Sequence, residues 1–288
     1  MTDPNPTPRR LAVALALLAT STLLALSPLA GATIPAGQTP GADTSSHDAQ
    51  ATEAPPVVRS WRTAPRHSAG IAPDPVQWKD RAIVQVYAAS TYGWRGRFAV
   101  HPWVIVKRSG ETAYTRYDVV GWRAPDVVQR NYAVPDGLWY GAVPQLLVDH
   151  RGDGVDAMID AIEAAIARYP YASEYRSYPG PNSNTFLAHI GREVPALRLD
   201  LPANAIGKDY RPITAPLGLS PTGSGLQASL LGLFGASLGW QEGLEFNVLG
   251  LHFGIDLNRP ALRLPFVGRI GCDDLRPADL AAPGPAGR

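Results

Sequence analysis

The fold class is decided by residues 224–268, which read SGLQASLLGLFGASLGWQEGLEFNVLGLHFGIDLNRPALRLPFVG. Glycine recurs every few residues in this stretch, and short apolar runs fill the intervals. This spacing is typical of short strands that are joined by tight turns. The last third of the chain is therefore predicted to be a meander of β-strands.

Three further strands are expected upstream. Residues 81–89 (RAIVQVYAA) are apolar and β-branched, which predicts a buried strand. Residues 97–107 (RFAVHPWVIVK) form the next strand, where Pro102 indicates a sheet edge or a bulge. Residues 113–122 (AYTRYDVVGW) follow a Ser-Gly turn at 109–110, the pattern of a hairpin.

Two helices are expected between the groups of strands. Residues 152–170 (GDGVDAMIDAIEAAIARYP) carry Asp153 as a candidate cap and Pro170 as a terminator. The apolar residues of this helix share one face: Val155, Ile159, Ile162 and Ile166. A shorter helix is expected from about Ser183 to Glu193. Strands, then helices, then strands predict a single α+β domain, in which two helices cover one face of an antiparallel sheet.

The N-terminus indicates export. A basic pair precedes about 20 uncharged, mostly apolar residues, and Ala-Gly-Ala at 30–32 suits signal peptidase. Residues 1–32 are therefore a signal peptide or, if uncleaved, a membrane anchor. The Pro-, Ser- and Thr-rich residues 33–75 are expected to be a disordered linker, 76–271 a globular domain and 272–288 a flexible tail. The protein is expected outside the cytoplasmic membrane, either periplasmic or anchored to that membrane.

Composition excludes several classes of site. A net charge of +1 over 288 residues gives no basic surface for nucleic acid. The single cysteine, Cys272, excludes an internal disulfide framework and multi-thiolate metal sites. The acidic turn around His150, with Asp149, Asp153 and Asp156, lacks the spacing of an EF-hand. No metal or cofactor is expected.

The segment YPGPNSNTF at 178–186 is the strongest candidate site. Ser183 lies at the expected start of the second helix, where free backbone N–H groups and the helix dipole favour negative charge. A serine there suits a nucleophile, and Asn182 suits an oxyanion donor. Because Asn and Ser are also the commonest N-caps, a purely structural role remains the alternative.

A serine nucleophile needs a base, and six histidines are present. His47 and His67 lie in the expected linker, while His189 is six positions from Ser183 and therefore on another helix face. His101 lies mid-strand among large apolar residues, where burial favours the neutral, basic form. The alternative for His101 is a buried histidine that bonds a backbone carbonyl.

Two aromatic-glycine loops, YGWRGRF at 92–98 and PDGLWYG at 135–141, complete the candidate features. Loops of this kind form platforms for carbohydrate or peptide, or they cover the core of a sheet. The sequence leaves both alternatives open.

Several motifs together resemble an uncharacterised bacterial envelope family, a domain of unknown function. The motifs are VQVYAASTYGWRGRFAVHPWVIVK, YTRYDVVGWR, YPGPNSNTF, IGKDY and EGLEFNVLGLHFGID. The resemblance covers most of residues 81–268 and implies an N-terminal anchor or signal. It implies no activity.

The order of the candidate residues also resembles circularly permuted papain-like enzymes, such as PPPDE-type peptidases and lecithin:retinol-acyltransferase-like proteins. In those families a strand histidine precedes an N-C-x-x-F-like motif that opens a helix. Here His101 comes first, and PNSNTF follows with Ser183 in the place of the cysteine. The departure matters, because serine does not form a thiolate-like anion at neutral pH and needs His101 as a general base. Asp118, on the next strand, is the candidate to orient His101.

The sequence therefore supports a first hypothesis and an alternative. The first is an exported hydrolase or acyltransferase on amide or ester bonds, with Ser183, His101 and Asn182 as its catalytic residues. The alternative is a non-catalytic envelope domain, for binding or structure, with a degenerate papain-like site. An envelope peptide, peptidoglycan or a lipid is the expected ligand, and the membrane is a partner if the N-terminal segment is uncleaved.

Overall fold

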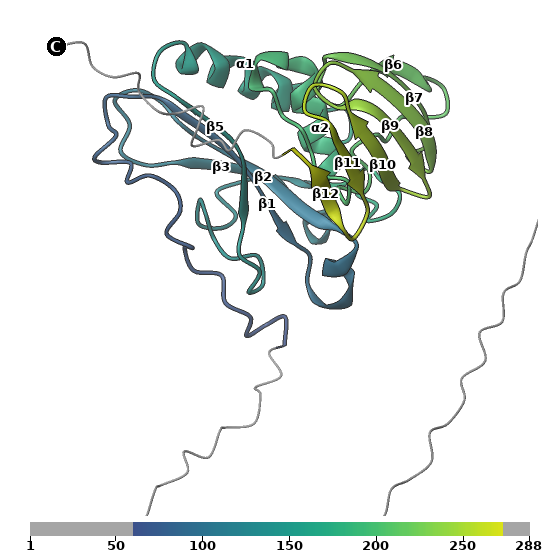
Figure 1. Cartoon of the computed structure of the whole chain (residues 1–288). Helices are drawn as coiled ribbons and strands as arrows, with labels where there is room; N and C mark the ends of the chain where they lie inside the picture. The colour runs from purple at the N-terminus through teal and green to yellow at the C-terminus, as the bar shows by residue number, and fades with distance from the viewer. Residues whose placement is uncertain (1–59, 273–288) are drawn as a thin grey trace, which may run out of the picture. The chain divides into compact units, whose positions relative to one another are not determined.

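The computed structural model describes residues 60–272, which form a single α+β domain made mostly of strands (Figure 1). The α+β class is thus confirmed. The expected signal peptide or anchor, most of the expected linker and nearly all of the expected tail lie outside the described residues. Within residues 60–272, none of the helices has the length and hydropathy needed to cross a bilayer.

The first sheet has five antiparallel strands in the order β4-β3-β2-β1-β5. Its strands are β1 (Ile83–Ser90), β2 (Val100–Lys107), β3 (Thr115–Val119), β4 (Val128–Arg130) and β5 (Gln145–Arg151). The expected buried strand is β1, in which only the last residue is exposed. The expected hairpin joins β2 to β3.

Pro102 lies in β2, which is an inner strand of this sheet. It pairs with Ala88 of β1 in an unbroken register, but β3 pairs only with residues 104–106. On its β3 side, Pro102 therefore has no strand neighbour that needs its missing N–H. Pro102 thus lies at a local edge of the sheet, as predicted, although β2 is an inner strand, because the short β3 does not extend to it.

Two helices cover one face of the first sheet. They are α1 (Val155–Ala167) and α2 (Ser183–Glu193), and both expected ranges are confirmed within a few residues. Val84 and Val86 of β1 share a core with Ile159 of α1 and Phe186 of α2. The first residue of α1 follows Gly154, which occupies the cap position with φ of 78°, so the cap predicted at Asp153 is wrong. Gly154 adopts this left-handed conformation without the steric penalty that a side chain brings.

The opposite face of the first sheet carries an aromatic core. Tyr87 of β1 and Trp103 of β2 stack with ring centroids 5.8 Å apart, and Trp139 packs against the same cluster. Strand alternation therefore places His101, two residues before Trp103, on this aromatic face rather than on the helix face.

The predicted C-terminal meander is confirmed, but it forms a second antiparallel sheet of its own. Its seven strands follow one another in sequence order, β6 to β12, and each pairs with its neighbours by hairpins. They are β6 (Leu217–Leu219), β7 (Gly225–Leu230), β8 (Phe234–Gly239), β9 (Gly243–Val248), β10 (Leu251–Asp256), β11 (Ala261–Leu264) and β12 (Gly268–Gly271). The prediction of a single sheet is therefore wrong, because the strands form two sheets. Sequential hairpins satisfy each strand locally, so no strand needs to join the first sheet.

Residues 60–75, which were expected to be part of the disordered linker, are packed onto the domain. The carboxylate of Asp136 accepts hydrogen bonds from the N–H groups of Ile71 (2.8 Å) and Ala72 (3.1 Å). Ser68 forms a β-bridge with Gly137. The boundary at residue 76 is therefore too late. A partner more than 60 positions away fixes this polar segment, and its composition alone does not reveal that partner.

Candidate functional site

A cavity of about 740 Å³ opens where the N-terminus of α2 meets the ends of β2 and β3. This volume lies within the range of about 300–1,000 Å³ that is usual for small-molecule sites. His101, Asn182 and Ser183, the three residues selected from the sequence, all line it. Both predicted aromatic-glycine loops also contribute side chains. The aromatic residues of its wall are Trp61, Tyr92, Trp122, Tyr132, Trp139, Tyr140 and Tyr175.

Ser183 is the first residue of α2, and Asn182 is its cap. The Asn182 side-chain oxygen accepts hydrogen bonds from the N–H groups of Asn184 (2.9 Å) and Thr185 (3.2 Å). The Thr185 hydroxyl accepts from the Asn182 N–H in return, which completes a capping box. Asn182 is thus the N-cap of α2, and Ser183 has no capping role.

The polar groups of Ser183 remain available to a ligand. Ser183 is buried within the protein, yet it lines the cavity. Among residues 60–272, no hydrogen bond involves its hydroxyl or its backbone N–H, whereas Asn182 satisfies the next two amides. A free N–H at a helix N-terminus suits an anion or a developing oxyanion.

The amide of Asn182 is fully engaged. It donates to the carbonyls of Ile206 (3.0 Å) and Ser177 (3.3 Å). To serve as an oxyanion donor, the role predicted for it, Asn182 must exchange one of these bonds for the substrate. The backbone N–H of Ser183 needs no such exchange.

Asn184 ties the helix of Ser183 to the strand of His101. Its amide donates to the carbonyl of Ile206 (2.9 Å) and to that of Val100 (3.3 Å), the residue before His101. Its buried side-chain oxygen has no partner in the described part of the chain. Asn184 also lines the cavity, next to Ser183 in the chain.

His101 lies flat against Trp139, with ring centroids 3.7 Å apart and planes 11° apart. Burial holds the pKa of His101 below its usual value, although Asp118 opposes this effect. The imidazole is therefore neutral at pH 7 and able to accept a proton. No hydrogen bond joins it to Ser183 in the described chain, so the two residues share the cavity without direct contact.

Asp118 lies on the Nε2 side of the imidazole. Its Oδ2 is 3.7 Å from Nε2 of His101, slightly long for a hydrogen bond. The same oxygen accepts hydrogen bonds from Nε (3.1 Å) and Nη2 (2.8 Å) of Arg116. Burial raises the pKa of Asp118, but His101 and Arg116 outweigh it and leave that pKa below its usual value. Asp118 is thus an ionised carboxylate on the Nε2 side of the ring.

The histidines at positions 150, 189 and 252 do not line this cavity. His150 contacts the carbonyl of Leu197 (3.0 Å), His189 that of Ala165 (2.9 Å) and His252 that of Ala203 (3.2 Å). Residues 60–272 contain no group of three or more His, Cys, Asp or Glu side chains arranged to hold a metal ion.

Arg116, Trp139 and Asn184 are not among the predicted site residues, although Trp139 lies in the PDGLWYG loop and Asn184 in the YPGPNSNTF segment. A signal for Arg116 was present, because TRYD places it two residues before Asp118 and on the same face of the strand. Trp139 arrives from a loop and Asn184 bonds a strand more than 80 residues away. No local pattern identifies those two contacts.

Comparison with known proteins places the site in an uncharacterised domain. Residues 81–210 match the family described as Protein of unknown function (DUF3750). The matched range contains His101, Asp118, Asn182 and Ser183, and it ends before the seven-stranded sheet begins at Leu217. No curated protein and no solved structure matches the chain. The domain of unknown function is thus shown, whereas the envelope and papain-like relationships stay predictions.

Proposed function

We propose that the cavity is the active site of a hydrolase or acyltransferase that cleaves an ester or amide bond of an apolar substrate. Ser183 is the nucleophile and His101 is the general base. One observation carries this proposal: His101 and Ser183, from segments more than 80 residues apart, line the same aromatic cavity, and within residues 60–272 the Ser183 hydroxyl has no hydrogen-bond partner. Burial lowers the pKa of His101, which favours the neutral, proton-accepting ring.

In the proposed reaction, the Ser183 hydroxyl oxygen attacks the carbonyl carbon of the substrate while His101 accepts the hydroxyl proton. Collapse of the tetrahedral intermediate breaks the ester or amide bond, and His101 returns the proton to the leaving group. Water or another acceptor then attacks the acyl-serine by the same route in reverse. Water completes a hydrolysis, and an alcohol or amine completes an acyl transfer.

Asp118 supports the proton transfer from behind the imidazole. As His101 becomes charged, the distance of 3.7 Å to Asp118 is expected to shorten, since apo sites are often loose and tighten with substrate. Arg116 holds the carboxylate in place with two hydrogen bonds to Oδ2. Asp118 is therefore a positioning residue that stabilises the imidazolium.

The backbone N–H of Ser183 supports the proposed oxyanion site. It lies at the positive end of the α2 dipole and has no protein partner among the described residues. One such donor typically contributes about 10²–10³-fold to the rate of acyl transfer. Asn182 adds a second donor only if its amide leaves Ile206 or Ser177.

The wall of the cavity supports an apolar or aromatic substrate group. Seven aromatic side chains line it, and the basic side chains there are Arg66, Arg95 and His101. Arg66 already covers the Tyr140 ring at 4.2 Å. A lipid acyl chain or an apolar peptide side chain fits this lining. Export to the cell envelope, as the N-terminus predicts, places such substrates within reach.

A binding function without catalysis is the second candidate. Two observations favour it: the His101 ring is stacked against Trp139, and among the hydrogen bonds of the described residues none joins it to Ser183. Serine also lacks the intrinsic reactivity of the cysteine found in papain-like sites. In this case the same cavity holds an apolar ligand and leaves it unchanged.

The test is hydrolysis of p-nitrophenyl esters of increasing acyl length by the full chain. Ser183→Ala is compared with Ser177→Ala, a matched control because Ser177 also lines the cavity but lies outside the helix. We expect kcat/KM to fall about 10³-fold or more in Ser183→Ala and to stay near wild type in Ser177→Ala. Equal activity in wild type and Ser183→Ala contradicts the proposal. Binding of the ester without turnover favours the second candidate.

A further inference from the structure

The seven-stranded sheet has its polarity reversed. Along β7 the side chains of Leu226, Ala228 and Leu230 are exposed, whereas those of Gln227 and Ser229 are buried. In a soluble antiparallel sheet the apolar residues of such an alternation face the core. Here they face outward.

The strand register makes the outer face continuous. Paired positions carry one unbroken row of aliphatic side chains across all seven strands, from β6 to β12. The row consists of Leu219, Leu226, Leu238, Leu244, Ile255, Leu262 and Ile270. We call this surface, with its neighbouring rows and turns, the apolar face.

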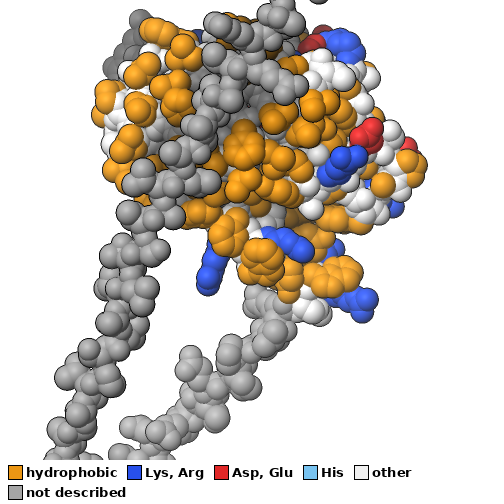
Figure 2. Space-filling view, turned by 90° about the vertical axis from the view of Figure 1, so that its right-hand side faces the viewer, with side chains coloured by type: hydrophobic (Ala, Val, Ile, Leu, Met, Phe, Trp, Pro, Cys, Tyr) orange, Lys and Arg blue, Asp and Glu red, His pale blue; other side chains and the backbone are white. Residues whose placement is uncertain are grey.

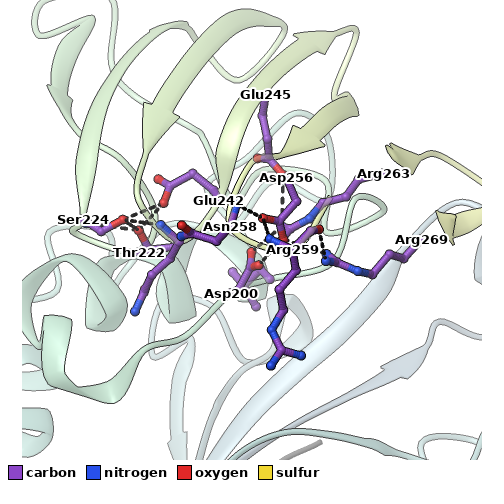
Figure 3. Close-up of polar contacts among 12 residues, drawn as sticks. Asp200, Thr222, Ser224, Glu242, Glu245, Asp256, Asn258, Arg259, Arg263 and Arg269 are labelled. Atoms are coloured by element: carbon purple, nitrogen blue, oxygen red, sulfur yellow. Dashed lines mark hydrogen bonds and ion pairs between the residues drawn. The ribbon is translucent and has the colours of Figure 1, made fainter. Parts of the chain in front are cut away.

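The inner face of the same sheet is fixed by charged partners from the segment before it. Lys208 bonds Glu245 (2.8 Å), and Asp209 pairs with His252 (3.3 Å). Arg263 pairs with Asp200 and Asp256 (Figure 3). If the sheet packed with its opposite face inward, these buried charges would lose their ion-pair partners, which is strongly unfavourable. The outward direction of the apolar face is therefore set by the fold.

The apolar face is larger than an ordinary surface patch. Between Leu217 and Ile270, 17 large hydrophobic side chains of the sheet and its turns are exposed, and Trp240 is the most exposed of them at 77%. With about 200 Å² per large side chain, roughly half of it exposed, they present on the order of 1,500 Å². The largest apolar patch of a typical monomer is about 300–600 Å². A surface of this size is expected to have an occupant.

The charges around the apolar face distinguish between occupants. Between residues 194 and 272, no acidic side chain is exposed: Asp209, Glu242, Glu245 and Asp256 are buried, and half-buried Asp200 bonds Arg263. Figure 2 shows hydrophobic side chains over much of the visible surface, with basic side chains at its lower edge. An apolar surface with a basic edge is complementary to lipids that carry anionic headgroups.

A loop beside the apolar face adds an aromatic and basic element. The 3-10 turn Gly93–Arg97 exposes Trp94 (71%), and its Arg95 and Arg97 are also exposed. The loop joins the apolar face through Phe98, whose ring lies edge-on to Phe266 at 5.1 Å. Tryptophan concentrates at membrane–water interfaces, and arginine extends its head to the headgroups.

We propose that the apolar face lies flat on an anionic lipid bilayer. The strands of four to six residues at its centre are shorter than the roughly 9–11 residues that a spanning strand needs, so the sheet rests in the interface. The Gly93–Arg97 loop also borders the cavity, since Tyr92, Arg95 and Ala99 line it. Docking therefore brings the mouth of the cavity to the lipid surface. The docking does not depend on the activity proposed above.

Position-specific quenching in the full chain tests the docking. In a Cys272→Ser background, Leu262→Cys on the apolar face and Thr112→Cys in the β2–β3 turn are each labelled with an environment-sensitive fluorophore. The probe is vesicles of phosphatidylcholine and phosphatidylglycerol that contain nitroxide-labelled lipid. Any binding by the N-terminal apolar segment is common to both proteins, so only contact at the labelled position separates them.

We expect lipid nitroxide to quench the label at position 262 severalfold more strongly than the label at position 112. Replacing Arg95 and Arg97 by Gln is expected to weaken this quenching in anionic vesicles but not in neutral ones. Equal quenching at positions 112 and 262 overturns the proposal. A second result also overturns the proposal: without lipid, the protein has the mass of a dimer and the label at position 262 is shielded from aqueous iodide. In that case a second copy of the chain covers the apolar face. Thermal unfolding checks that each variant is folded.

Discussion

Asp118→Asn tests the buried charge cluster that supports His101. Arg116 and Asp118 are 1% and 0% exposed, and the guanidinium makes two hydrogen bonds to one carboxylate oxygen. Removing one partner of a buried ion pair typically costs about 3–5 kcal/mol. Arg116 keeps its hydrogen bond to the carbonyl of Val134 (2.8 Å) and its position over the Trp103 ring (4.1 Å). We therefore expect the lower end, about 3 kcal/mol.

Urea unfolding of the full chain measures this loss. At a typical slope of about 1–3 kcal/mol per molar urea, the midpoint is expected to fall by about 1 M or more, with the slope unchanged. Asp126→Asn is the matched control, because Asp126 is exposed, and it is expected to stay within about 0.5 kcal/mol of wild type. In Arg116→Met combined with Asp118→Leu, which removes both charges, most of the stability is expected to return. A loss below about 1 kcal/mol in Asp118→Asn refutes the reasoning.

Two further predictions concern two residues that line the cavity, His101 and Asn182. Because burial holds the pKa of His101 below its usual value, the unfolded chain takes up a proton at a higher pH than the folded chain. The resulting stability is present above about pH 6.5 and is lost as the pH falls. In urea titrations between about pH 7 and 5, His101→Gln should therefore flatten the decline of the unfolding free energy. Asn182→Ala removes the cap of α2 and should lower the unfolding free energy by about 1–2 kcal/mol, compared with less than about 0.5 kcal/mol for Asn204→Ala, in urea titrations. Unchanged stability in Asn182→Ala contradicts the capping assignment.

The local elements were predictable because their signals are local. The capping box at Asn182 and the apolar run after it define α2 at the predicted residues, Ser183 to Glu193. The glycine spacing of residues 224–268 likewise defines hairpins between neighbours.

The direction of the seven-stranded sheet was not predictable from its period. Alternation indicates that one face differs from the other, and the usual assumption turns the apolar face inward. Here Glu245 and His252 face inward, because they form ion pairs with Lys208 and Asp209, which precede the sheet in the chain. Because these partners are about 40 positions apart, a sequence pattern read over ten residues does not reveal their pairing.

The candidate site was only partly accessible to sequence reasoning. The order of His101 and Ser183 in the chain suggested a pair through the family resemblance, and the structure places both at one cavity. The stacking of Trp139 on His101 and the bridge from Asn184 to Val100 depend on how loops and sheet meet. These contacts have no local sequence pattern.

The most direct test of the central claim is the position of a covalent adduct. The full chain is treated with an alkyl fluorophosphonate, digested with trypsin and fragmented by mass spectrometry. Cleavage after Arg176 and Arg192 yields a peptide, residues 177–192, that contains both Ser177 and Ser183. If Ser183 is the nucleophile and His101 its base, the adduct lies on Ser183 in the wild type and is absent from the His101→Gln variant. An adduct on Ser177, or no adduct on this peptide, contradicts Ser183 as the nucleophile.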